Sequence, residues 1–402
     1  MGNISAGLPG QRKLLFTAGL GWLFDAMDVG LLSFILAALA TDWRLTTQQV
    51  GWLGSINSIG MAVGALLAGV LADRVGRKPV FLFTLLLFSV ASGLSAMATT
   101  YAVMALFRFF AGVGVGGELP VASTLVAESV PARERGRIVV LLESFWAGGW
   151  ILAAVAGYYL IPAYGWRSAF LVGAIPALYA VYLRVQLPDS PRTPVPAART
   201  KRSVFANMAA VWSREYVRPT LMLWVLWFCV GFSYYGIFLW LPSVLLFKGF
   251  GLIKSFQYVL IMTLAQLPGY FSAAYLIERV GRKFVLVTYL TLTAVSAYFF
   301  GNATGLTTLL IAGSLLSFFN LGAWGALYAY TPETYPGAFR ATGAGMAAAI
   351  GRIGGVLGPL LVGYLGKGRV GLIFNLFFII IMIGAIAVLL LGRETKAEEL
   401  LD

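Results

Sequence analysis

Five ionisable side chains lie within apolar stretches that are long enough to cross a membrane. They are Asp25, Asp28, Arg108, Glu143 and Arg352. A charged side chain is costly to place in hydrocarbon, so each of these residues indicates a functional site. Two carboxylates three residues apart share a helix face, and a facing arginine can neutralise one while the other exchanges a proton. A static structural ion pair is the alternative role for Arg108.

The helical rise places these residues at comparable depths. At about 1.5 Å per residue, Asp25 lies about 16 Å, Asp28 about 21 Å and Arg108 about 20 Å from the same side of the membrane. Arg108 can therefore face either aspartate. Arg352 lies near mid-membrane with no carboxylate in its own stretch, and its planar guanidinium matches a carboxylate. We expect it to bind the carboxylate of a substrate; the alternative is an internal pair with Glu143, which a substrate could displace.

Aromatic and amide side chains accompany these charges. An aromatic ligand needs stacking faces and one or two polar groups. Asn320, Trp324 and Tyr328 follow one another at four-residue spacing, so they share a helix face. The other candidates for binding a ring are Trp146, Trp150, Tyr234, Tyr235 and Trp240, with Gln266 as a weaker candidate for contacting a ring nitrogen. Tryptophan and tyrosine also form belts at membrane interfaces, an alternative that is stronger for Trp150 and Trp240 than for Trp324.

The composition indicates a polytopic membrane protein. The 402 residues are 59% hydrophobic with a mean hydropathy of +0.85, and 11% are charged, against roughly 25% in soluble domains. The net charge of +13 would suggest nucleic acid as the partner of a soluble chain, but here it reflects basic loops, and we expect no nucleic acid. The chain has no histidine, so proton handling falls to Asp and Glu, and its one cysteine, Cys229, excludes an internal disulfide.

Twelve apolar stretches are long enough, at about 20 residues, to cross a bilayer as helices. They lie near residues 14–40, 50–72, 80–98, 101–127, 138–161, 168–187, 219–246, 255–277, 284–301, 305–330, 341–365 and 370–391. The first is too long and too polar for the core of a secretory signal. Most of the 29 Lys and Arg residues fall in the termini and in alternate loops, which predicts that both termini are cytoplasmic.

An internal repeat divides the chain into two halves. Residues 73–78 read DRVGRK, and residues 278–283, which lie 205 positions later, read ERVGRK. The same offset relates Glu128 to Glu333, Arg135 to Arg340, Trp22 to Trp227 and the pair 189–190 to the pair 394–395. It relates Asp25 and Asp28 to Val230 and Ser233, so the acids belong to one half only. We expect an all-α membrane protein with two pseudo-symmetric six-helix bundles, residues 1–187 and 219–402, joined by a cytoplasmic linker at 188–218.

Several motifs carry a family resemblance. GVLADRVGRKPV (69–80), RFFAGVGVGGELP (108–120), ESVPARERGR (128–137) and PDSPR (188–192) resemble the signatures of the major facilitator superfamily and of its sugar-porter-like branch. More narrowly, GWLFDAMDVG (21–30), VVLLESFWAGGW (139–150) and SFFNLGAWGALYAYTPE (317–333) resemble bacterial niacin transporters of that superfamily. The resemblance implies the major facilitator fold, uptake of a pyridine carboxylate and a bacterial inner-membrane location.

The resemblance also implies roles for individual residues. It makes Asp25 the proton-binding residue, with Arg108 as its partner and Asp28 as a less certain neighbour. It places Arg352 beside the substrate. It places Glu143 at the position where sugar porters have a sugar-contacting glutamine, and the acid at this position disfavours a sugar as the substrate. A charged latch that holds the outward-facing state would comprise Asp73, Arg74, Arg77 and Glu128, with Glu278, Arg282, Glu333 and Arg340 as its second copy. The alternative for the latch is ordinary positive loop charge.

The sequence therefore predicts a secondary transporter, not an enzyme. It contains no phosphate-cradling GxxxxGK[ST] loop and no cluster of metal ligands, so we expect no cofactor and no bound metal. The expected partners are a small pyridine carboxylate, protons and the lipid bilayer, and carriers of this fold commonly work as monomers. The expected activity is alternating-access import of nicotinate coupled to protons, with nicotinamide as a further substrate.

Two other functions compete with this one. The chain could carry another small aromatic or organic acid, or an organic cation held by Asp25, Asp28 and Glu143. From a different class, it could be a transport-inactive nutrient sensor. The short segments outside the first and last spans disfavour the sensor, which would be expected to carry a long cytoplasmic extension.

Overall fold

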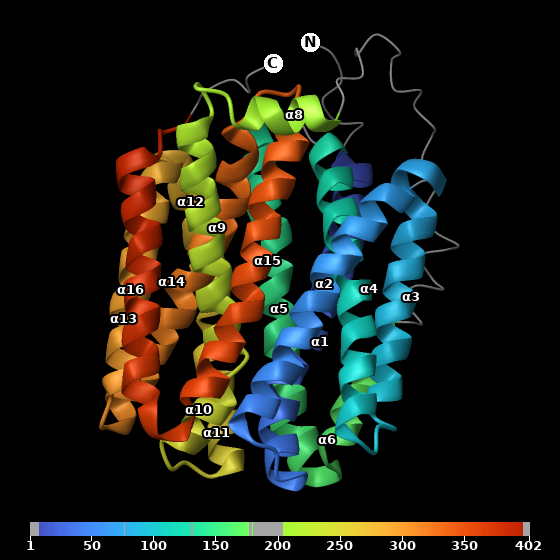
Figure 1. The fold of residues 1–402 in the computed structure, drawn as a ribbon, viewed down its shortest axis with the longest axis vertical. Coiled ribbons are helices and arrows are strands. Elements are labelled where there is room, and N and C mark those ends of the chain that lie inside the picture. Colours follow the sequence, from blue (N-terminus) through green and yellow to red (C-terminus); the bar gives the residue numbers. More distant parts are fainter. Residues whose placement is uncertain (1–7, 76, 130–131, 177–178, 180–203, 397–402) are drawn as a thin grey trace.

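A computed structural model describes residues 8–75, 77–129, 132–176, 179 and 204–396 (Figure 1). These residues form helices joined by turns and short connections, and none of them forms a β-strand. Eleven of the predicted spans coincide with helix; the sixth begins in helix, and most of its later residues lie outside those that the structure describes. The predicted boundary between the first half and the linker lies outside the described residues.

The first half of the chain forms one group of helices, drawn in blue to green in Figure 1. Within it α1 packs along α5, and α4 packs against both α2 and α3. The helices are α1 (Leu8–Asp42), α2 (Thr47–Val75), α3 (Arg77–Ser95), α4 (Tyr101–Ser129), α5 (Ala132–Tyr164) and α6 (Trp166–Val172).

The second half forms another group, drawn in yellow to red beside the first (Figure 1). Here α15 packs along α9, and α13 packs against α14 and α16. Its helices are α9 (Val217–Phe238), α10 (Leu241–Phe247), α11 (Leu252–Leu264), α12 (Gln266–Arg279), α13 (Arg282–Asn302), α14 (Leu306–Glu333), α15 (Arg340–Leu365) and α16 (Val370–Leu391), with a 3-10 turn at Lys367–Arg369. The short helix α8 (Val204–Val211) lies across the end of the bundle where α1 begins and α16 ends.

Two of the predicted spans are interrupted helices. The seventh span is α9 followed by α10, with Pro242 just after the break, and the eighth is α11 followed by α12, with Pro268 just after the break. Proline has no N–H to donate and disfavours helical geometry in the residue before it. Both spans are therefore bent rather than straight.

The two halves touch closely at the end of the bundle opposite α8. There α2 and α15 approach until a side chain at Gly51 would meet the backbone of Pro359 and Gly363. Slightly deeper in the bundle, the hydroxyl of Ser55 donates a hydrogen bond of 2.7 Å to the carbonyl of Val356. α5 of the first half also packs against α11, α12 and α14 of the second half.

One contact between the halves joins repeat-equivalent positions. The hydroxyl of Ser33 on α1 donates a hydrogen bond of 3.0 Å to the carbonyl of Phe238 on α9, and the two residues are 205 positions apart. That separation equals the offset of the internal repeat. A pseudo-two-fold axis that relates the halves therefore passes close to this contact.

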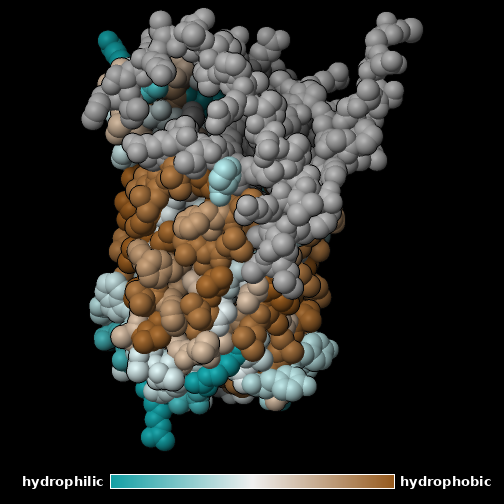
Figure 2. All heavy atoms as spheres, turned by 90° about the vertical axis from the view of Figure 1, so that its right-hand side faces the viewer, coloured by the Kyte–Doolittle hydropathy of each residue, from teal (hydrophilic) through white to brown (hydrophobic). Residues whose placement is uncertain are grey.

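The surface is suited to a bilayer. Figure 2 shows a broad apolar band above a polar rim at one end of the molecule. Within the described residues, nine helices are long and apolar enough to cross a membrane. Large apolar side chains are exposed on α3 and α4, for example Phe83, Val90, Leu106 and Phe110. By contrast α1 is buried along most of its length, so its two acids lie inside the protein.

Candidate functional site

Asp28 and Arg108 form an ion pair inside the first half. Nη1 of Arg108 lies 3.2 Å from Oδ2 of Asp28, and both side chains are buried. Nε and Nη2 of Arg108 donate to the hydroxyl of Ser95, at 3.2 and 3.0 Å. The hydroxyl of Ser92 donates to Oδ1 of Asp28, and the guanidinium stacks on the ring of Phe170 at 4.6 Å. Both charges are thus compensated within one bundle.

The expected pairing of Arg108 with Asp25 is wrong. Arg108 pairs with Asp28, the aspartate whose predicted depth is nearer its own, about 21 Å against about 20 Å. Asp25, three residues closer to the α8 end, is also buried. Its charge interacts favourably with that of Arg352 on α15. Asp28 is thus held within the first half, whereas Asp25 has an electrostatic interaction with a residue of the second half.

Arg352 reaches the boundary between the halves. Its Nη1 donates to the hydroxyl of Tyr235 at 3.0 Å and lies 3.8 Å from the sulfur of Met61 on α2. Nε and Nη2 donate to none of the residues that the structure describes. The side chain is half-buried. Arg352 thus retains donors for a further acceptor, the arrangement expected of a group that binds a carboxylate.

Glu143 on α5 occupies a different part of this boundary. Its side chain is buried, and within the described residues its Oε2 has no hydrogen-bond partner. The indole of Trp22 lies beside the carboxyl group. Glu143 and Arg352 are both described, and they form no ion pair, so the alternative of a static pair between them is not observed.

The predicted aromatic residues come together from both halves. The indole N–H of Trp146 on α5 donates to the hydroxyl of Tyr234 on α9 at 2.5 Å. The Tyr234 ring lies 5.0 Å from Trp324 at an interplanar angle of 33°, and Trp324 lies 5.9 Å from Tyr328. Asn320, one turn before Trp324, is buried, and its Oδ1 has no partner among the described residues. These groups offer flat apolar surfaces and an available polar atom to a small ring.

Trp150 and Trp240 are both buried rather than exposed at an interface. Trp150 packs edge-on against Tyr234 at 6.3 Å. The indole of Trp240 donates to the carbonyl of Pro359 on α15 at 3.1 Å, so its hydrogen bond helps to join α15 to the break between α9 and α10. The interfacial-belt alternative does not describe their positions.

Sequence reasoning missed Tyr270 and gave little weight to Gln266 and Trp22. All three are buried. The polar side-chain atoms of Tyr270 and Gln266 have no hydrogen-bond partner in the described part of the chain, and the indole of Trp22 faces the carboxyl group of Glu143. Tyr270 lies one turn after Gln266 on α12, and that spacing was a signal that could have identified it. Trp22 precedes Asp25 by three residues, so the acids of α1 also pointed to it.

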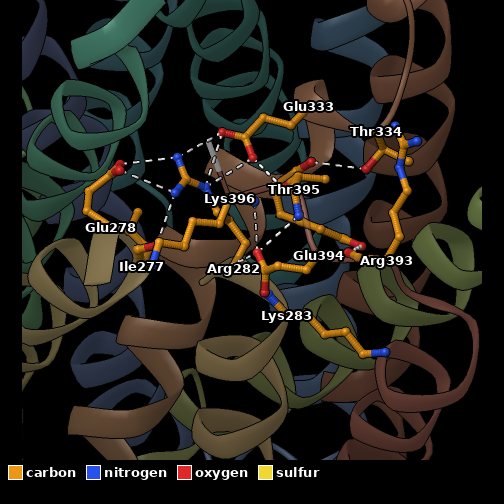
Figure 3. Close-up of polar contacts among 11 residues, drawn as sticks. Ile277, Glu278, Arg282, Lys283, Glu333, Thr334, Arg393, Glu394, Thr395 and Lys396 are labelled. Atoms are coloured by element: carbon orange, nitrogen blue, oxygen red, sulfur yellow. Dashed lines mark hydrogen bonds and ion pairs between the residues drawn. The ribbon is translucent and has the colours of Figure 1, made fainter. Parts of the chain in front are cut away.

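The second copy of the predicted latch is largely assembled (Figure 3). Arg282 binds Glu333 at 3.1 Å and Glu278 at 3.2 Å. The hydroxyl of Thr395 donates to Glu333 at 2.6 Å. Arg340 does not join this ion-pair network through its Nε, which instead donates to the carbonyl of Tyr335 at 3.1 Å. The side chains of the first copy, Asp73, Arg74, Arg77 and Glu128, lie outside what the structure describes.

Glu394 is an addition to this network that the latch prediction did not include. Its carboxylate accepts hydrogen bonds from the backbone N–H groups of Arg282 at 2.8 Å and Lys283 at 3.0 Å (Figure 3). These are the first residues of α13, where backbone donors lack partners within the helix. Glu394 therefore fixes the segment after α16 to the beginning of α13. Within the described residues, no group of acidic or cysteine side chains could hold a metal ion.

The family assignment agrees with this architecture. The model of the Major Facilitator Superfamily matches residues 18–272 and 258–401. The chain belongs to the Major Facilitator Superfamily. It is a multi-pass membrane transporter and not an enzyme.

Two similar members of the superfamily carry specific names. The putative niacin/nicotinamide transporter NiaP of Bacillus subtilis is 61% identical over 97% of this chain and 98% of its own length. The niacin transporter NiaP of Acinetobacter baylyi is 46% identical over 96% of this chain and 95% of its own length. The resemblance to bacterial niacin transporters is thus confirmed.

A solved structure supports the superfamily fold. The partially occluded inward-open conformation of the xylose transporter XylE from E. coli matches with a TM-score of 0.80. The match covers 97% of this chain and 99% of that one, at 18% sequence identity. At this identity the match bears on the fold alone, and it confirms the predicted major facilitator fold.

Proposed function

We propose that this superfamily member imports nicotinate by alternating access, with nicotinamide as a second substrate. The observation that carries the proposal is Arg352, whose unused donors lie at the boundary between the halves beside Tyr235. The ring of Tyr235 lies 5.1 Å from that of Tyr234, which adjoins Trp324 and, through it, Tyr328. A guanidinium beside flat aromatic surfaces suits a planar aromatic anion. The names of the two NiaP relatives support the same substrate.

We further propose that import is coupled to protons and that Asp25 carries the coupled proton. Asp25 lies within electrostatic reach of Arg352, so in this proposal its carboxylate competes with that of the substrate for the same cation. Protonation of Asp25 would release Arg352 for the substrate. Asp28 is less suited to this role because Arg108 and Ser92 already hold it.

Uptake of labelled nicotinate into proteoliposomes tests the substrate and the coupling separately. We expect accumulation above that of empty vesicles, and more of it when the outside is more acidic than the inside. Absence of accumulation would refute the substrate. Accumulation that ignores the pH gradient would refute the coupling. Asp25→Asn should abolish the response to the gradient, whereas a variant that still responds would show that Asp25 does not carry the proton.

Another aromatic acid or an organic cation is the competing substrate class. Replacing Arg352 with alanine separates the anion from the cation, because an anion loses its charged partner while a cation does not. We expect nicotinate binding by Arg352→Ala to weaken by about 100-fold, the loss of about 2.7 kcal/mol of charged hydrogen bonding. Binding that is unchanged would favour a cation.

The proposed location is the bacterial inner membrane, with the α8 end of the bundle in the cytoplasm and the chain acting as a monomer. The excess of basic residues in the loops at that end supports the orientation. Accessibility of an exposed residue such as Arg214, replaced by cysteine, to an impermeant thiol reagent in intact cells tests it. Labelling only after the cells are opened is the expected result.

A further inference from the structure

Glu143 is a buried acid with no cation beside it. Its side chain is 1% exposed, and in the described part of the chain it forms no ion pair. Arg108 is held by Asp28, and Arg352 by Tyr235 with the charge of Asp25 nearby. A buried carboxylate without a partner is costly, whereas a neutral carboxyl group keeps one O–H donor and avoids that cost.

The groups that face Glu143 are uncharged and come from four helices. Trp22 on α1 lies beside the carboxyl group. The titratable groups within electrostatic reach are Tyr234 on α9, Tyr270 on α12 and Tyr328 on α14. The Tyr270 hydroxyl and Oε2 of Glu143 both lack hydrogen-bond partners among the described residues. Oε2 of the carboxyl group is therefore available to a ligand.

Tyr328 connects Glu143 to Arg352. Tyr328 interacts electrostatically with both side chains. The acid and the guanidinium are therefore both within electrostatic reach of the same tyrosine. Tyr328 also packs 5.9 Å from Trp324, whose ring lies 5.0 Å from that of Tyr234 at an angle of 33°. The site thus contains the cation Arg352, the acid Glu143 and aromatic rings close to both.

We propose that Glu143, in its neutral form, donates a hydrogen bond to the ring nitrogen of the pyridine carboxylate whose carboxylate binds Arg352. The inference rests on the proposed function and adds the residue that recognises the ring. The nitrogen of an unprotonated pyridine ring is a hydrogen-bond acceptor, and no covalent bond changes. A ring without the nitrogen leaves the buried donor unpaired, which is the source of strong discrimination in hydrogen-bonding sites.

Binding of three ligands to the purified full-length protein at neutral pH tests this assignment. The ligands are nicotinate, benzoate, which has the carboxylate without the ring nitrogen, and nicotinamide, which has the nitrogen without the charge. We expect the wild type to bind benzoate at least about tenfold more weakly than nicotinate. This comparison needs no variant, so it stands even where a substitution prevents folding.

Two substitutions then locate the discrimination. Glu143→Leu removes the donor and should bind nicotinate and benzoate within about twofold of each other. Glu143→Gln keeps an N–H donor and should retain a preference for nicotinate. The matched control is Glu215→Gln, the same chemical change at an exposed residue, which should bind all three ligands as the wild type does. Gel filtration confirms that each variant is folded.

The outcomes separate the two proposals. If the wild type binds benzoate as tightly as nicotinate, or if Glu143→Leu keeps the preference, Glu143 does not recognise the nitrogen, and the inference is overturned although nicotinate remains a substrate. Loss of the preference in Glu143→Gln as well as Glu143→Leu would also overturn it, because the amide donor should suffice. If the wild type does not bind nicotinate at all, the proposed function itself fails.

Discussion

At the residue scale, the pair of Asp28 and Arg108 illustrates how a charge can be kept inside a bilayer protein. Each member is buried, and the donors of Arg108 and the acceptors of Asp28 are shared with Ser95 and Ser92. Such a pair contributes little compared with two apolar residues, but losing one member leaves a buried charge alone. We therefore expect a single substitution in the pair to destabilise the protein much more than replacement of both residues.

Asp28→Asn should lower the free energy of unfolding by about 3–5 kcal/mol, because Arg108 loses its counter-charge in the interior. Adding Arg108→Gln should recover much of that loss. Thermal unfolding in detergent measures both. The same change at Asp42, an exposed residue at the end of α1, serves as the control. A double variant no more stable than Asp28→Asn would contradict this account.

The sequence predicted that these residues lie within spans, but it did not identify which aspartate meets Arg108. Helical rise determines depth to within about one turn, 5.4 Å, and Asp25 and Asp28 are less than one turn apart. The choice depends on how α1 is rotated against α4 and α5, which is set by tertiary packing. For the same reason the approach of Asp25 to Arg352 could not be foreseen.

At the scale of elements, close approach of helix backbones organises the bundle. A side chain at Gly112 on α4 would meet the backbone of Asn57 on α2. Small residues at such crossings allow the helices to pack closely where hydrocarbon provides no hydrophobic drive for association. Gly345 on α15 has no neighbouring atom where its side chain would lie, so it offers a matched comparison.

Gly112→Ala should destabilise the protein by about 1–3 kcal/mol, because the backbones of α2 and α4 must separate. Gly345→Ala should be neutral or stabilising by up to about 1 kcal/mol, the gain in helix propensity. Unfolding temperatures of the purified variants decide between these expectations. Equal effects of the two substitutions would show that the crossing is looser than described.

The capping of α13 by Glu394 leads to a second prediction for an element. Glu394→Ala removes the acceptor for the N–H groups of Arg282 and Lys283 and should cost about 1 kcal/mol, a typical loss for a helix cap. Hydrogen exchange of the first turn of α13 should accelerate. Glu215→Ala provides the exposed control. Unchanged protection at Arg282 would mean that the cap contributes nothing.

Apolar length was enough to predict where the spans lie, and the structure follows those ranges closely. The breaks in the seventh and eighth spans were less apparent, although Pro242 and Pro268 mark them. Whether a proline bends a helix or ends it depends on what neighbouring helices supply to the freed carbonyl groups. The repeat of 189–190 at 394–395 pointed to the importance of Glu394, but its hydrogen bonds required the fold.

At the scale of the whole molecule, the contacts of α2 with α15 close the end opposite α8. Those contacts include the hydrogen bond of Ser55 to Val356. In the alternating access and orientation that we propose, this end must open to admit substrate. The individual bundles were predictable from the repeat, but which of their faces meet was not, because the lipid-facing and partner-facing surfaces are both apolar.

A disulfide between Ser55→Cys and Val356→Cys should therefore stop uptake. The variant is made with Cys229, the one native cysteine, replaced by serine. We expect uptake to be lost on oxidation and restored on reduction. Each single-cysteine variant should transport under both conditions. Uptake that continues in the cross-linked protein would contradict alternating access through this end.

The hydrogen bond between Ser33 and Phe238 has a consequence for how the sequences of the two halves can diverge from each other. A dimer of two identical six-helix chains would meet itself at this point, with the same side chain approaching from both sides. In a single chain the two copies are encoded separately. One copy can then supply a hydroxyl donor while the other supplies a carbonyl and a ring packed on Trp150. Fusion of the halves thus permits a contact on the symmetry axis that no symmetric pair could form, and it equally permits acids on α1 without acids on α9.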